Sequence, residues 1–212
     1  MLGPRVIRSL RGLSSSALAD ASTLAVAVFV VTVAAEHGLE SRLSPVTHMI
    51  SEYANTGWGG LMVAGFVAWG FSFAGTALLG SRYWGHAGIR WSDRVLIGCF
   101  WLAAAGALVT ASFSTQTSEG VLPAGVKFTL RGRLHDLGSG AITLGIFGAA
   151  LAALVVIDWS VAFRRWTVGV IVFVIATDAG LLAVGSSVGG LRQRLLVAAG
   201  CAWQLSIIMV FR

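Results

Sequence analysis

Six long apolar segments alternate with short polar ones along the chain. Each holds about 20 residues, the length that an α-helix needs to cross the hydrocarbon core of a bilayer. The pattern therefore predicts six membrane-spanning helices, at residues 13–35, 58–80, 95–113, 134–157, 166–184 and 195–211. These spans nearly exhaust the 212 residues. We expect one integral membrane domain over residues 1–212, an all-α polytopic bundle with six transmembrane helices and no soluble domain.

The overall composition agrees with this pattern. Hydrophobic residues make up 56% of the chain and charged residues 11%, whereas about 25% of the residues of a soluble protein are charged. The net charge of +6 is a feature of many nucleic-acid-binding proteins. Here, however, the basic residues stand at the ends of apolar segments, where they set topology and meet anionic lipid. We therefore exclude nucleic acid and expect the lipid bilayer as partner; the sequence identifies no protein partner.

The first apolar segment admits two interpretations. Arg5, Arg8 and Arg11 precede it and the small residues Ala34 and Ala35 end it, as in a secretory signal peptide. No A-x-A cleavage site follows the apolar core. We therefore expect an uncleaved first span, whereas cleavage would leave five spans.

The distribution of basic residues predicts the orientation. With six spans, both termini and the loops at 81–94 and 158–166 share one side of the membrane. That side carries nine of the fifteen basic residues: Arg5, Arg8, Arg11, Arg82, Arg90, Arg94, Arg164, Arg165 and Arg212. Because cytoplasmic loops are enriched in Lys and Arg, we expect a multi-pass protein of the bacterial inner (cell) membrane with both termini cytoplasmic.

A polar segment at residues 43–57, which we call the first polar island, concentrates reactive side chains before the second span. Ser44 followed by Pro45 is typical of a helix start, so we expect a short helix from Pro45. On an α-helix four polar side chains would share one face: His48, Ser51, Glu52 and Asn55. A second polar island at residues 131–140 opens the fourth span. Both islands are expected on the extracytoplasmic side.

Three motifs carry a family resemblance. They are SPVTHMISEYANTG before a Gly-rich span, then FSTQTSEG, then LRGRLHDLGSG at the opening of a later span. In order and spacing the chain resembles the domain-of-unknown-function 998 (DUF998) family of bacterial multi-pass membrane proteins. The resemblance implies a helical bundle in the cytoplasmic membrane and no established activity.

The islands admit an enzymatic interpretation. His48, Ser51 and Glu52 form a candidate acid/base and nucleophile set, to which His135 and Asp136 of the second island could contribute. The protein would then be a membrane-embedded hydrolase or transferase acting on lipid. This spacing is permissive and not diagnostic of catalysis.

The same residues have a structural interpretation. Ser51 would then bond within its own helix, Glu52 would pair with Arg42 or Arg131, and the histidine would meet lipid headgroups. Asp136 would only mark the start of a helix. Both interpretations remain open from sequence.

The sequence does not identify a cofactor, and a metal ion and a haem are the two candidates. His37, His48 and His135 are expected on one side of the membrane, and Glu52 and Asp136 could complete a zinc-type set of ligands. No H-E-x-x-H pair is present, and the last two spans contain no histidine. A haem between His48 and His135 is disfavoured because both lie near the surface.

Asp178 is a carboxylate inside the fifth span. At about 1.5 Å per residue it lies roughly 10 Å below the outer end of that helix, where an unpaired charge is costly. We expect it to face the bundle interior, either as a ligand or ion site or paired with Arg192 or Arg194. With Arg131 and Arg133 it completes the candidate ligand-binding residues.

Several further residues are expected to take part in the packing and anchoring of the helices. Gln204 is expected to form hydrogen bonds between helices. Small residues make a packing stripe on the fourth span: Gly145, Gly148, Ala149 and Ala152. Tryptophans near span ends are expected to anchor at the interface: Trp58, Trp84, Trp91, Trp159 and Trp166. The two cysteines, Cys99 and Cys201, are expected to remain unpaired.

Three functions remain as hypotheses. The first is an extracytoplasmic-facing polar pocket that binds a lipid headgroup or a small envelope metabolite, and the others are the lipid enzyme and a structural partner subunit. We further expect the two islands to converge, with His48 close to His135. A mixed-charge pocket of this kind would suit a zwitterionic or phosphate-bearing headgroup.

Overall fold

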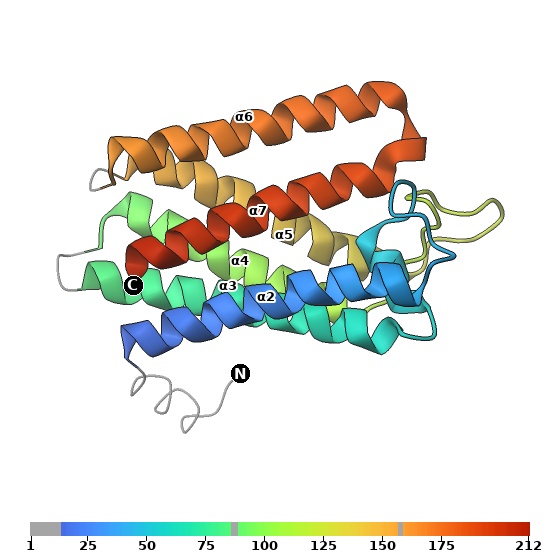
Figure 1. Cartoon of the computed structure of the whole chain (residues 1–212), viewed down its shortest axis with the longest axis horizontal. Coiled ribbons are helices and arrows are strands. Elements are labelled where there is room, and N and C mark those ends of the chain that lie inside the picture. Colours follow the sequence, from blue (N-terminus) through green and yellow to red (C-terminus); the bar gives the residue numbers. More distant parts are fainter. Residues whose placement is uncertain (1–13, 86–88, 157–158) are drawn as a thin grey trace.

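The computed structural model describes residues 14–85, 89–156 and 159–212 (Figure 1). Arg5, Arg8 and Arg11, on which the choice between span and signal peptide depends, lie outside the described residues. The six long helices are α2 (Ser15–Leu39), α3 (Gly59–Gly85), α4 (Trp91–Ser112), α5 (Leu130–Val155), α6 (Val161–Val184) and α7 (Gly189–Phe211). Two short 3-10 helices join them, η1 (Ile50–Asn55) and η2 (Ser186–Val188).

All six long helices are sufficiently long and apolar to cross a membrane. The described residues contain no β-strand, and their one isolated bridge joins Ser118 and Val121. The predicted all-α, six-span bundle is therefore confirmed. Each helix overlaps the span expected in its part of the chain.

The helices run side by side along the length of the molecule (Figure 1). The segments that join α2 to α3, α4 to α5 and α6 to α7 gather at one end of the bundle, which we call the loop end. The start of α2 and the C-terminus lie at the opposite end, the terminal end. Both polar islands belong to the loop end.

Helices α4 and α5 pack so closely that their backbones touch. A Cβ atom on Gly145 would lie 2.6 Å from the carbonyl oxygen of Cys99, and one on Gly106 would lie 2.6 Å from the carbonyl oxygen of Gly138. Neither distance leaves room for a side chain. The predicted small-residue stripe on the fourth span is therefore a packing seam against α4.

Gln204 of α7 lies in the interior and joins two helices. Its Nε2 donates to Ser72 Oγ at 2.6 Å and to Thr76 Oγ1 at 3.3 Å, and its Oε1 accepts from Trp69 Nε1 at 3.2 Å. The predicted interhelical hydrogen bonding of Gln204 is confirmed. Cys99 and Cys201 are both free thiols, also as expected.

Two of the tryptophans expected at the interface are instead buried. Trp84 and Trp159 are 2% and 5% exposed and surround Phe211 near the terminal end, with ring centroids 5.1 and 6.4 Å from the Phe211 ring. The prediction that they anchor at the interface was wrong, because neighbouring aromatic rings cover both indoles. Trp58 and Trp91 are exposed at helix ends, and their role as interface anchors stays a prediction.

Helix α6 packs against the bundle much less than the other helices. Thr167 and Val174 are its only buried residues among those described. Most of its apolar side chains point outward, which is compatible with lipid as their neighbour. This loose packing leaves space between α6 and its neighbours α5 and α7.

Candidate functional site at the loop end

The first polar island is not the α-helix that its sequence predicts. Its helix is η1, a 3-10 helix that begins at Ile50, and Ser44 instead caps a turn by accepting a hydrogen bond from the Val46 amide. The start of α7 supplies the reason. Gln193 Oε1 accepts from the Ile50 amide, and Arg194 donates to the His48 carbonyl, both at 2.6 Å. These tertiary bonds take the backbone groups that an α-helix would use internally.

Glu52 holds the loop between α4 and α5. Its carboxylate is 5% exposed and accepts from the Gly120 amide at 2.8 Å, the Glu119 amide at 3.0 Å and the Thr117 hydroxyl at 3.2 Å. Glu119 and Gly120 both have positive φ, 54° and 76°, and two successive N–H groups in such a turn form an anion-binding concavity. Glu52 therefore anchors the loop, and this role replaces the expected pairing with Arg42 or Arg131.

The other candidate catalytic groups of the first island are engaged locally. His48 Nδ1 lies 3.0 Å from the Thr47 hydroxyl, and Ser51 is buried in η1. Among the described residues no hydrogen bond joins the side chains of His48, Ser51 and Glu52 to one another. The structure therefore does not assemble these three side chains into a hydrogen-bonded catalytic set.

The second island connects to the first through the loop. Asn55 Nδ2 donates to the Thr115 carbonyl at 3.0 Å, and His135 Nδ1 lies 2.6 Å from the carbonyl oxygen of Phe113. Because a carbonyl only accepts, Nδ1 carries the hydrogen and the Nε2 of a neutral His135 is unprotonated. That Nε2 is buried with no partner among the described residues.

The remaining candidate residues of the second island lie on the surface. Arg131, Arg133 and Asp136 are exposed on the first turns of α5. The Arg133 guanidinium lies 6.0 Å from the Phe128 ring centroid. Residues 113–117 connect the two islands, and direct convergence of His48 and His135 stays a prediction.

Arg194 is a central residue of the loop end, whereas the sequence suggested it only as a possible partner of Asp178. Its Nε donates to His37 Nε2 at 2.8 Å, its Nη1 donates to the carbonyls of His48 and Gly190, and its guanidinium lies 5.5 Å from the Tyr53 ring centroid. Burial raises the pKa of the Tyr53 phenol, which keeps the hydroxyl neutral as it donates to the Leu43 carbonyl. Arg194 thereby fixes the start of α7 against the first island.

The three histidines proposed as metal ligands do not gather. Within the described ranges no group of three or more His, Cys, Asp or Glu side chains has a geometry that could hold a metal ion. The Nε2 of His37 faces the cationic Arg194. That nitrogen is therefore already used as a hydrogen-bond acceptor.

A cavity of about 500 Å³ lies between α5, α6 and α7 near the loop end. We call it the interhelix cavity. Its polar wall includes Asp178 of α6 and Arg192 of α7, whose Oδ1 and Nε atoms form an ion pair at 2.9 Å. Of the two partners that the sequence suggested for Asp178, the structure selects Arg192. The Asp178 side chain is 40% exposed, because the cavity is open.

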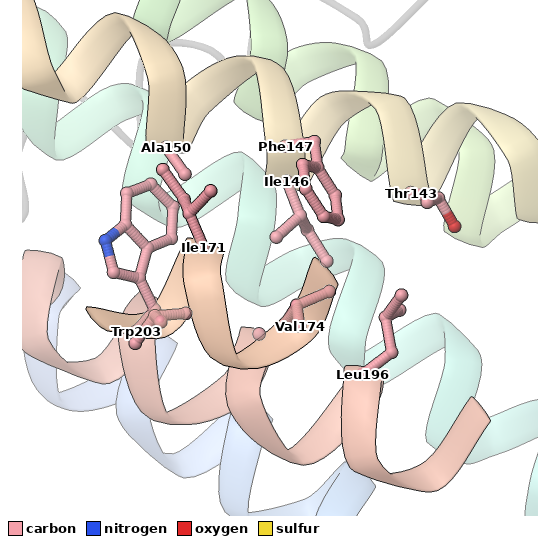
Figure 2. A pocket seen from close by; sticks show the side chains of 10 residues that line it. Thr143, Ile146, Phe147, Ala150, Ile171, Val174, Leu196 and Trp203 are labelled. Carbon is pink, nitrogen blue, oxygen red and sulfur yellow. The ribbon is translucent and has the colours of Figure 1, made fainter. Parts of the chain in front are cut away.

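Two further cavities neighbour the interhelix cavity. Toward the loops, Met49, Glu119 and Gly120 line a space of about 240 Å³ whose wall also includes Arg192. Toward the middle of the bundle the walls become apolar, and a small cavity of about 20 Å³ follows (Figure 2). Figure 2 shows side chains of α5, α6 and α7 converging there, and the two cavities share four wall residues: Thr143, Phe147, Val174 and Leu196.

These features define a multi-pass membrane protein of six helices with a cavity that is charged at the loop end and apolar below. Residues 23–209 match the family described as protein of unknown function (DUF998). The chain therefore belongs to the DUF998 family, as its three motifs indicate. Neither the curated proteins nor the solved structures contain a significant match to it.

Proposed function

We propose that the protein binds a lipid-like amphiphile with a zwitterionic or phosphate-bearing headgroup in the interhelix cavity. One observation carries the proposal. The Asp178–Arg192 ion pair lies on the wall of a 500 Å³ cavity whose walls become apolar toward the bundle interior. This order of charged and apolar groups matches the order of headgroup and acyl chain in a membrane lipid.

The ion pair suits exchange with a ligand. A headgroup phosphate would bond to the Arg192 guanidinium, a group whose planar donors match phosphate oxygens. An ammonium group on the same headgroup would meet the Asp178 carboxylate. Both side chains remain partly exposed, at 34% for Arg192 and 40% for Asp178, so neither needs a large rearrangement to change partner.

The volume and the access route support the same ligand class. Small-molecule sites typically have volumes of about 300–1,000 Å³, a range that includes the interhelix cavity. Because α6 buries only Thr167 and Val174 among its described residues, an acyl chain can enter sideways from the bilayer beside this helix. On the proposed orientation, with the termini in the cytoplasm, the headgroup would come from the extracytoplasmic leaflet.

Photo-crosslinking in vesicles tests the proposal. The full chain would be reconstituted with a phosphatidylcholine that carries a diazirine on its acyl chain, and labelled peptides would be identified by mass spectrometry. We expect labelling of Phe147, Val174 and Leu196 above that of Leu24, which is 65% exposed on the outer surface of α2. Equal labelling of the cavity and the outer surface would refute a specific site.

A charge-neutral variant gives the matched comparison. Asp178→Asn with Arg192→Gln removes both charges and leaves polar side chains, and the loss of one charge-assisted bond of about 1.5–3 kcal/mol predicts at least about tenfold weaker cavity labelling. The control is Asp20→Asn with Arg212→Gln, which neutralises an ion pair of 3.1 Å at the terminal end. This control should leave cavity labelling unchanged.

The enzymatic and structural-subunit hypotheses receive no comparable support. The enzyme would need His48, Ser51 and Glu52 to act together, yet the carboxylate of Glu52 is occupied by three donors of the loop. No surface feature of the described residues specifies a protein partner. Ligand binding is therefore the function we advance.

A further inference from the structure

A second buried carboxylate at the loop end contrasts with Glu52. Glu36, in the last turn of α2, is 1% exposed, and among the described residues neither of its oxygen atoms has a hydrogen-bond partner of good geometry. It faces the first turn of α3, where the backbone N–H of Met62 lies beside the carboxylate as a single weak donor. Nothing in the sequence distinguishes this residue, because an acidic residue near the end of a span is ordinarily solvated.

The groups around Glu36 provide no counterion. The neighbour one turn along the chain is Glu40, at the C-cap of α2, which repels a negative charge. On η1 the nearest titratable groups are Tyr53, whose hydroxyl donates to the Leu43 carbonyl, and Glu52, which the loop already binds. The first turn of α3, residues 59–62, contains only glycine, leucine and methionine.

Arg194, a cation of this region, bonds to groups other than Glu36. Arg194 of α7 donates to His37 Nε2 and to the carbonyls of His48 and Gly190. Its Nη2 is buried, and within the described part of the chain it has no partner, Glu36 included. The His37 imidazole accepts from this arginine, so it is not a cation for Glu36 either.

Electrostatics then decides the state of the Glu36 side chain. An ionised carboxylate with no counterion and only a single weak backbone donor is costly in a protein interior, and such a group takes up a proton instead. Glu52 shows the opposite arrangement, because two backbone amides and a hydroxyl bond to its carboxylate. The two buried glutamates differ in the donors available to them and not in exposure.

From this geometry we infer that Glu36 is a proton-binding site of the loop end, a neutral carboxylic acid at neutral pH in the folded protein. The proton is taken from water at the loop end and returned there, without any covalent step. This property is independent of the interhelix cavity, which Glu36 does not line. It provides the bundle with one buried group whose charge depends on pH.

Infrared spectroscopy of the full chain in vesicles tests the inference. The carbonyl stretch of a protonated buried carboxylic acid is separate from the bands of carboxylates and amides. We expect this band at neutral pH in the parent protein, its loss in Glu36→Gln, and its retention in the control Glu40→Gln, which changes the neighbouring glutamate. A parent spectrum without the band, or an unchanged band in Glu36→Gln, would overturn the assignment.

A second variant covers the case in which Glu36→Gln does not fold. Glu36→Asp keeps the acid but moves it by one methylene, so its carbonyl band should shift in frequency and persist. A band at the parental frequency in Glu36→Asp would show that it belongs to another residue. That result would also overturn the proton site at Glu36.

Discussion

Replacing Glu52 with glutamine should release the loop between α4 and α5 without unfolding the bundle. The parent carboxylate presents two acceptor oxygens, of which Oε1 accepts from Gly120 and Thr117 and Oε2 accepts from Glu119. Glutamine retains one oxygen, and its NH₂ group, a donor, must take the place of the other. At least one of the two backbone amides therefore loses its acceptor and faces another N–H group.

The size of the effect follows from the bonds that are lost. A hydrogen bond to a charged group contributes about 1.5–3 kcal/mol. Since every 1.4 kcal/mol is a factor of ten, exchange of the Glu119 and Gly120 amides through local opening should accelerate by about 10- to 100-fold. The six helices are held by contacts elsewhere, so global thermal stability should change little.

Hydrogen–deuterium exchange with mass spectrometry measures this directly, on peptides that cover residues 113–129. The matched control is Glu119→Gln, because the Glu119 side chain is exposed and, among the described residues, accepts only a long hydrogen bond of 3.5 Å from the Thr47 hydroxyl. Its exchange should remain within a few-fold of the parent. If Glu52→Gln exchanges no faster than this control, the role of Glu52 as loop anchor is wrong.

Three further variants test the packing of the bundle. Gln204→Leu removes three interhelical hydrogen bonds of about 0.6 kcal/mol each and leaves the indole N–H of Trp69 unpaired. The free energy of unfolding in detergent should therefore fall by about 2–4 kcal/mol. The control Ser206→Ala, which breaks a bond within α7, should change stability little. Gly145→Ala should destabilise by about 1–3 kcal/mol through a clash with α4, whereas Gly140→Ala, with open space around its Cβ, should be neutral or stabilising in the same assay. Arg194→Lys keeps the charge but loses the planar set of donors, so hydrogen exchange in residues 44–50 should accelerate while a stable bundle remains; unchanged exchange there would contradict the proposed role of the guanidinium.

The sequence alone was sufficient for the class of fold and for part of its packing. Six apolar segments of membrane-spanning length predict six helices, because a helix satisfies its own backbone in a bilayer wherever enough apolar residues follow one another. Gln204 and the stripe around Gly145 were also predictable, since a polar or a very small side chain in a span must face another helix. Each of these conclusions rests on residues that lie close together in the chain.

The candidate site could be predicted only in part. The sequence suggested that Asp178 could pair with an arginine just before the last predicted span, but it left Arg192 and Arg194 equivalent. The structure separates them, since Arg192 completes the ion pair on the cavity wall and Arg194 turns toward the first polar island. Two positions along α7 correspond to about 200° of rotation, which places the two side chains on different faces of the helix. Which face meets which neighbour depends on how the helices pack.

Tertiary structure also decided the local conformation of the first polar island and the state of its carboxylates. The island forms η1 instead of an α-helix because Gln193 and Arg194, more than a hundred residues away in sequence, bond to its backbone. Glu52 accepts hydrogen bonds from three donors in a distant loop, whereas among the described residues Glu36 has only the weak Met62 backbone donor beside it, although both are glutamates beside an apolar span. Local sequence determines where a helix can form. The partner of a buried polar group depends on which distant segments the packed helices bring next to it.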